Sequence, residues 1–170
     1  MYHSSVMMLQ SYFEEYLSCV VSLGAWWKAV EMRAYLGEVH RDAERFSSMP
    51  AGEVSRYAQE RISFENRAAK LKALFGVLFD CSPFADDDAE RKCLDFALVR
   101  NIIAHSGGWP NESHAPQVES PNVIIESARI GESVFYRLTI TPQFFGECLR
   151  AMASSVEAIE RRIALDPVFE

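Results

Sequence analysis

The stretch LVRNIIAHSGGWP, residues 98–110, continues an apolar helical pattern that starts in CLDFALV at residue 93. Apolar residues lie on most sides of the expected helix, and a helix of this kind is buried on most of its sides. One side can pack into a helical bundle, and the other side needs a second partner, which a homodimer supplies most simply. The chain is therefore expected to form a helical bundle that pairs with a second copy.

Three polar residues interrupt this apolar helix, which is expected to run from about residue 89 to His105 and to end at the SGG that follows. Asn101 and His105 are four residues apart and share a face. Arg100 and His105 are separated by about 140° around an ideal helix, an angle that a long arginine side chain can span. A buried guanidinium is costly without a partner, so a carboxylate, backbone carbonyls or a phosphate ligand should meet it.

The N-terminal half of the chain has the apolar spacing of three further helices. The first is expected to end or break at Gly24, the second to close near Pro50, and the third to run from Glu53 to about Phe79. The side chains expected to face the core are Val6, Leu9, Phe13, Leu17 and Val20 in the first helix, Trp27, Val30 and Ala34 in the second, and Ile62, Ala69, Ala73 and Val77 in the third, where Leu71, Leu74, Phe75 and Leu78 widen the stripe.

The C-terminal third changes its pattern. Residues 109–122 have the composition of a loop, and residues 122–141 are rich in β-branched and aromatic residues, which is typical of a β-hairpin. Thr141 followed by Pro142 predicts the start of a last helix. Its expected inner stripe is Phe145, Cys148, Leu149, Met152, Val156, Ile159 and Ile163. The expected fold is all-α: about five helices in one domain spanning residues 1–170, with a small hairpin inserted before the last helix.

Composition narrows the class of protein. The 170 residues are 49% hydrophobic, which is enough for one core. The net charge of −7 counts against nucleic-acid binding driven by overall charge, although thirteen arginines against four lysines suit specific contacts to phosphate or carboxylate. The four cysteines show no C-x-x-C pair and are expected to be small buried apolar residues in a reducing compartment.

No apolar run approaches the roughly 20 residues of a membrane helix, and the first residues do not follow a signal-peptide pattern. We therefore expect a soluble, cytoplasmic protein without a membrane partner.

The six residues Arg100-Asn101-Ile102-Ile103-Ala104-His105 match the signature of the HEPN superfamily (higher eukaryotes and prokaryotes nucleotide-binding), R-x4-6-H, often with a polar residue directly after the arginine. The bare pattern is expected about once by chance in this chain, and requiring the asparagine at the shortest spacing lowers that rate to below about 1%. The chain also resembles this superfamily in its helical layout. One branch usually carries a tyrosine two positions after the histidine, where this chain has Gly107, so regulation by nucleotidyl transfer to tyrosine is in doubt.

The resemblance implies a metal-independent endoribonuclease that needs no cofactor. In the family, the histidine is a general base on the ribose 2′-hydroxyl, the arginine stabilises the pentacoordinate phosphorane, and the polar neighbour positions them. These roles fall on His105, Arg100 and Asn101. Two subunits bring two motifs into one cleft, and the product carries a 2′,3′-cyclic phosphate. The implied setting is a toxin or phage-defence effector with RNA as substrate and an antitoxin or other protein as partner. Trp109 is expected to stack on a base of the RNA or to anchor its loop.

Other interpretations of the same residues remain open. His105 can cap the last carbonyls of its helix. Arg100 can pair with a carboxylate such as Glu14, Glu15 or Glu65. The chain can then be a non-catalytic HEPN-like module for dimerisation or for nucleotide or RNA binding, or an unrelated helical protein.

Two further patterns carry less weight. Arg33 and His40 also match the arginine–histidine spacing, but they lie among charged residues typical of a solvated surface. His105 and His114, even with acidic residues elsewhere, match no metal-ligand spacing. The acidic run 86–88 suits a helix start, so no metal site is predicted.

Overall fold

The computed structural model of the chain describes residues 3–60, 68–110, 120–130 and 133–166. Within these ranges the fold is mostly helical, with a two-stranded antiparallel hairpin directly before the last helix, as predicted. The elements are α1 (His3–Trp27), α2 (Ala29–His40), α3 (Ala43–Ser47), α4 (Ala51–Gln59), α5 (Ala68–Phe79), α6 (Asp87–Ser106), β1 (Val123–Ile130), β2 (Ser133–Ile140) and α7 (Pro142–Ala164).

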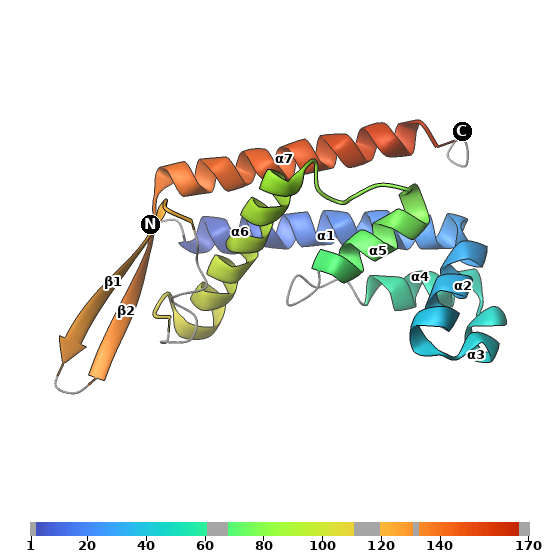
Figure 1. Cartoon of the computed structure of the whole chain (residues 1–170), viewed down its shortest axis with the longest axis horizontal. Helices are drawn as coiled ribbons and strands as arrows, with labels where there is room; N and C mark the ends of the chain where they lie inside the picture. Colours follow the sequence, from blue (N-terminus) through green and yellow to red (C-terminus); the bar gives the residue numbers. More distant parts are fainter. Residues whose placement is uncertain (1–2, 61–67, 111–119, 131–132, 167–170) are drawn as a thin grey trace.

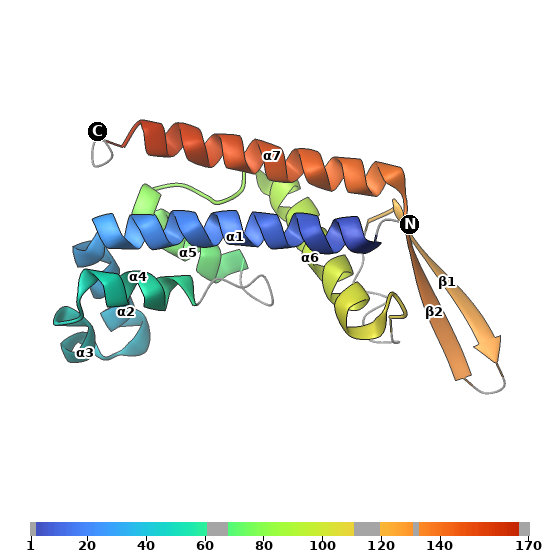
Figure 2. The same cartoon turned by 180° about the vertical axis from the view of Figure 1, so that it is seen from behind.

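The two longest helices, α1 and α7, run side by side in both views (Figures 1 and 2). An ion pair between Lys28 and Asp166, 2.5 Å from Nζ to Oδ2, joins the C-terminal ends of these helices. Helices α5 and α6 lie on one side of α1, in front of it in Figure 1 and behind it in Figure 2. Helix α1 is therefore the central element, with neighbours on three sides.

Phenylalanines fill the centre of the core. The largest fully buried side chains include Phe46, Phe75, Phe79, Phe96 and Phe144. Helix α1 does not end at Gly24 as predicted but continues through it to Trp27. A Cβ atom at Gly24 would lie 2.5 Å from Cζ of Phe79, so this glycine makes room for an aromatic ring and does not end the helix.

The inward faces predicted for the second and third helices are wrong in part. In α2 the buried residues include Met32 and Leu36, whereas Trp27, Val30 and Ala34 are exposed. Lys28 has non-helical backbone angles, with ψ of 46°, so the phase of α2 does not continue from α1.

The predicted third helix corresponds to α4 and α5, and Ile62 lies outside the described residues. In α5 the larger side chains Leu71, Leu74, Phe75 and Leu78 are buried, whereas Ala69 and Ala73 are exposed. The larger side chains are buried in preference to the alanines because each removes more apolar area from water.

The last predicted helix is confirmed as α7, and most of its predicted stripe is buried or half-buried. Leu149 is the exception, with 44% of its surface exposed. Thr141 caps this helix as expected, because its side-chain oxygen accepts the N–H of Phe144 at 3.1 Å.

The hairpin projects away from the bundle (Figures 1 and 2). Among its described residues, the buried side chains Val123, Leu138 and Ile140 lie at its base, whereas Phe135, nearer the tip at the start of β2, is 45% exposed. The strands pair in register, with Val123 opposite Ile140 and Ile125 opposite Leu138. The hairpin is thus fixed at its base by the helices and held elsewhere by its own ladder.

None of the described helices combines the length and the hydrophobicity that a transmembrane span requires.

Candidate functional site

Hydrogen bonds define both ends of helix α6, which carries the arginine–histidine motif. The Asp86 carboxylate accepts the backbone N–H three residues further on, at 2.8 Å. At the other end Gly107 adopts a left-handed conformation with φ of 62°. The N–H groups of Gly107 and Gly108 bond the carbonyls of Ile103 and Ile102, at 2.9 and 3.4 Å. The helix therefore ends at the predicted SGG, and the motif histidine lies in its last turn.

The structure brings Arg100 and Asn101 together. Nη1 of Arg100 donates to Oδ1 of Asn101 at 2.9 Å, and both residues are half-buried. The Nε of Arg100 is buried and has no hydrogen-bond partner among the described residues. The asparagine carbonyl thus satisfies one nitrogen of the guanidinium, whereas the buried Nε is left without a partner among the described residues.

The carboxylates considered as partners for Arg100 have other contacts or lie outside the described residues. Glu14 accepts a hydrogen bond from Gln10 at 3.0 Å, and Glu15 lies 3.7 Å from the sulfur of Cys19. Glu65 falls outside the described residues. Within the described ranges no ion pair includes Arg100, and a guanidinium without a carboxylate is available to an anionic ligand.

His105 is exposed, one helical turn beyond Asn101, where Cβ atoms of neighbouring turns are about 5–6 Å apart. It forms no hydrogen bond within the described residues. The nearby carbonyls of Ile102 and Ile103 are bonded by the glycine N–H groups, so His105 does not act as the helix cap. The imidazole is therefore free to meet a ligand on the same face as the Asn101 amide.

Trp109 follows the glycine turn, with its N–H bonded to the carbonyl of Ser106 at 3.1 Å. Its side chain is 55% exposed, so it does not anchor the loop by burial. Its place within a few residues of His105 keeps the predicted base-stacking role open.

Sequence reasoning missed the junction at Gly108. This buried glycine has φ of 88°, and its carbonyl accepts the N–H of Leu138 in β2 at 2.9 Å. A Cβ atom here would lie 2.8 Å from Cε1 of His3, the first residue of α1. The start of α1, the end of α6 and the base of the hairpin therefore meet at one residue beside the motif. The glycine pair was the only local signal for this contact.

The second arginine–histidine pair has a structural role. Nε of Arg33 donates to the carbonyl of Met49 at 2.8 Å. The ring of His40 stacks on Phe46 at 5.4 Å and meets Tyr57 edge-on at 5.7 Å between centroids. These side chains hold α2 against its neighbours.

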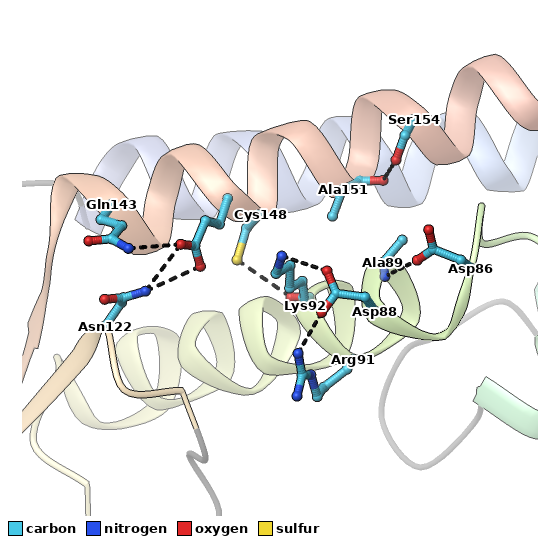
Figure 3. Close-up of polar contacts among 11 residues, drawn as sticks. Asp86, Asp88, Ala89, Arg91, Lys92, Asn122, Gln143, Cys148, Ala151 and Ser154 are labelled. Atoms are coloured by element: carbon cyan, nitrogen blue, oxygen red, sulfur yellow. Dashed lines mark hydrogen bonds and ion pairs between the residues drawn. The ribbon is translucent and has the colours of Figure 1, made fainter.

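A polar cleft of about 210 Å³ lies between the first half of α6 and α7 (Figure 3). Asp88 binds Lys92 at 2.6 Å and Arg91 at 2.5 Å, and these hydrogen bonds lower the pKa of the Asp88 carboxyl. Glu147 accepts from Gln143 at 3.0 Å and from Asn122 at 3.2 Å, which lowers the pKa of its carboxyl too. The carboxylates of Asp88 and Glu147 are thus satisfied within the protein, and the cleft is a weaker candidate than the end of α6.

Among the described residues, no group of three or more histidine, cysteine, aspartate or glutamate side chains is placed to hold a metal ion. The prediction that all four cysteines are buried is wrong for Cys19, which is exposed, and Cys81 is only half-buried. Cys93 and Cys148 are buried, and burial raises the pKa of each thiol to about 12.

The chain matches no protein-family model, no curated protein and no solved structure.

Proposed function

We propose that this chain is a metal-independent endoribonuclease of HEPN type that works as a homodimer. The observation that carries the proposal is the polar end of α6. There, Arg100 is bonded to Asn101 and has no carboxylate partner among the described residues, and His105 stands exposed one turn further on.

In the proposed reaction, His105 removes the proton from a ribose 2′-hydroxyl. The 2′-oxygen attacks the adjacent phosphorus, and the bond from phosphorus to the 5′-oxygen breaks. The leaving 5′-oxygen takes up a proton from the solvent, and His105 returns its proton to the solvent. The products are a 2′,3′-cyclic phosphate and a 5′-hydroxyl end, because the attacking group is the 2′-oxygen and not a water molecule. Imidazole suits the base because its ordinary pKa lies near neutrality.

Arg100 stabilises the negative charge that develops on the phosphorane oxygens. Its hydrogen bond to Asn101 draws the guanidinium toward the face that also carries His105. A fixed guanidinium loses less freedom when it binds phosphate than a mobile one does. Asn101 is therefore a positioning residue in this proposal, and Trp109 supplies an exposed ring on which a base can stack.

The same face of α6 supports the proposed dimer. Leu94, Leu98, Asn101 and His105 lie within about 60° on an ideal helix. The two leucines are half-buried in the single chain, so a second copy on this face would cover them. Two copies of the motif would then line one cleft, as the resemblance implies.

A non-catalytic HEPN-like module for dimerisation or for nucleotide or RNA binding is the second candidate. The observations that favour it are the net charge of −7 and the exposure of His105, which has no hydrogen-bond partner among the described residues. A role as a toxin or phage-defence effector, with an antitoxin as partner, belongs to the first candidate.

The experiment that separates the two candidates is an RNA cleavage assay in EDTA with end mapping. Wild-type protein is expected to leave 2′,3′-cyclic phosphate ends, and His105→Ala to lose cleavage. His40→Ala is the matched control, because the same chemical change falls on the histidine that packs between rings of the core. An RNA with one 2′-deoxyribose at a mapped cut should resist cleavage at that bond alone. A folded wild-type dimer that cuts no RNA would favour the binding module.

A further inference from the structure

Helix α1 exposes an apolar face along most of its length, on the side that α5 and α6 leave open. In Figure 2 this helix lies in front, with α7 above it and α4 below it. Met8 is 57% exposed, Tyr12 66%, Leu23 54% and Trp26 57%, and Cys19 lies among them. On an ideal helix these five residues fall within about 60°. The core residues Val6, Phe13, Leu17 and Val21 point to the opposite side.

This exposed stripe lies opposite the stripe that α1 packs into the core, so the fold of one chain does not bury it. Four of these exposed side chains are large, and two of them are aromatic. Large exposed apolar patches on soluble proteins mark surfaces that another molecule covers. The face spans residues 8–26, about 27 Å at the helical rise.

We propose that this face of α1 pairs with the same face of a second copy, with the two α1 helices antiparallel. Together the exposed side chains offer on the order of 500 Å² per copy, judged from the size of aromatic and aliphatic side chains. Two copies would then bury about 1,000 Å², the lower limit for a specific protein interface.

The shape of the face selects the antiparallel arrangement. A shallow groove of about 270 Å³ is lined by Cys19, Ser22, Leu23 and Trp26 from α1, with Ser55 and Gln59 from α4. The four α1 positions are spaced i, i+3, i+4 and i+7, which is the hole that receives one side chain in knobs-into-holes packing. Tyr12 is the most exposed aromatic side chain on the face and is the knob that fits it.

Placing Tyr12 of one copy in the groove of the other sets the register. The twofold axis then passes near residue 17, so Met8 faces Trp26 and Glu15 faces Cys19. Met8 against Trp26 makes a favourable sulfur–aromatic contact. Glu15 is the only charged residue on this face among the described residues. Antiparallel pairing keeps the two Glu15 carboxylates apart, whereas parallel pairing sets them opposite each other.

This contact is separate from the proposed ribonuclease site. Helix α6 packs on the far side of α1 (Figures 1 and 2). Together with the proposed α6 contact it would join more than two copies, so loss of the α1 contact should leave the α6 dimer and its RNA cleavage unchanged while the mass of the assembly falls. An inactive wild-type protein would leave the α1 contact standing.

The test is the molar mass in solution, by light scattering coupled to gel filtration over a dilution series. Tyr12→Arg should halve the mass or weaken association by about thirtyfold, because an aromatic side chain that fills a groove of its partner is a typical hot spot. Val39→Arg in α2 is the matched control, since it places the same charge on another exposed apolar residue, and should leave the mass unchanged. Circular dichroism checks that each variant is folded, and Tyr12→Ala gives a milder second variant. A wild-type monomer at every concentration, or unchanged association in both folded Tyr12 variants, would overturn the proposal.

Cross-linking tests the orientation. Glu15→Cys places a new thiol opposite the native Cys19 of the other copy, so mild oxidation should give a disulfide-linked dimer. Adding Cys19→Ser should abolish that product. A cross-linked dimer through Cys19 in the wild-type protein would show parallel pairing and overturn the antiparallel arrangement.

Discussion

Replacing Gly108 by alanine should destabilise the protein more than the same change at Gly107, although both glycines have positive φ. Gly107 has φ of 62° and no atom within 4 Å of an added Cβ, whereas Gly108 has φ of 88° and Cε1 of His3 at 2.8 Å. A non-glycine residue in the left-handed region costs about 1 kcal/mol, and displacing a packed ring adds about 1 kcal/mol or more.

The expected losses are therefore about 1 kcal/mol for Gly107→Ala and about 2 kcal/mol for Gly108→Ala. For a chain of this length they correspond to falls in Tm of about 2–4 °C and about 4–8 °C. Thermal unfolding followed by circular dichroism measures both. In a His3→Ala background, where the ring is removed, Gly108→Ala should cost no more than Gly107→Ala. Equal losses at the two glycines in the wild-type background would refute the packing of His3 on the end of α6.

Three other expectations follow from the structure. Arg100→Lys should lower the rate of RNA cleavage by about 10²–10³-fold with little change in Tm. Lysine lacks the planar guanidinium that can donate to Asn101 and to a phosphate at the same time. Cleavage kinetics and thermal unfolding measure the two effects. In the folded Tyr12→Arg variant at pH 8, where the proposed α1 contact is absent, iodoacetamide should modify the exposed Cys19 first and leave Cys93 and Cys148 unmodified, because burial raises the pKa of each of these two thiols to about 12. Peptide mass spectrometry reads the order of modification, and early modification of Cys93 would contradict the expectation. The pKa of Asp88 is lowered in the folded state, so its stabilisation should be present above the ordinary aspartate pKa and vanish as the pH falls through the pKa of the folded state. The free energy of unfolding of the wild type should therefore exceed that of Asp88→Asn near neutral pH but not in acid. Urea unfolding across pH measures both, and a difference between them that does not change with pH would contradict this expectation.

The parts of the fold that sequence predicts correctly carry strong local signals. Helix α6 has an aspartate cap and a glycine end, and both form the expected hydrogen bonds. The hairpin is visible as a change from helical to β-branched composition, and α7 starts at Thr141 and Pro142 as expected. In these elements the residues that start and end the structure are neighbours in the sequence, so spacing is informative.

The wrong predictions concern helix ends and inward faces that are determined by residues distant in the sequence. Gly24 has the local pattern of a helix end, but the ring of Phe79 occupies its open side and α1 continues. Val30 is apolar and was expected inside, yet the break at Lys28 turns it outward. Spacing within one segment carries no information on which neighbour covers which side.

In the candidate site too, the positions along one helix were predictable from the sequence, whereas the contacts between side chains were not. The position of Arg100, Asn101 and His105 on one helix end follows from their spacing. The bond between Arg100 and Asn101 required the structure, because the sequence suggested a carboxylate, backbone carbonyls or a phosphate as the partner of Arg100. The contact of His3 with Gly108 joins residues from opposite parts of the chain, and no motif spacing marks it.

The most direct test of the account compares wild-type protein with His105→Ala on one structured RNA in EDTA, with the cleavage rate and the chemistry of the new ends as readouts. We expect EDTA-resistant cutting to 2′,3′-cyclic phosphate and 5′-hydroxyl ends, and a rate lowered by about 10²–10⁴-fold in the variant, the usual contribution of a general base. Equal rates in the two proteins, or cutting by the wild type that stops in EDTA, would contradict it.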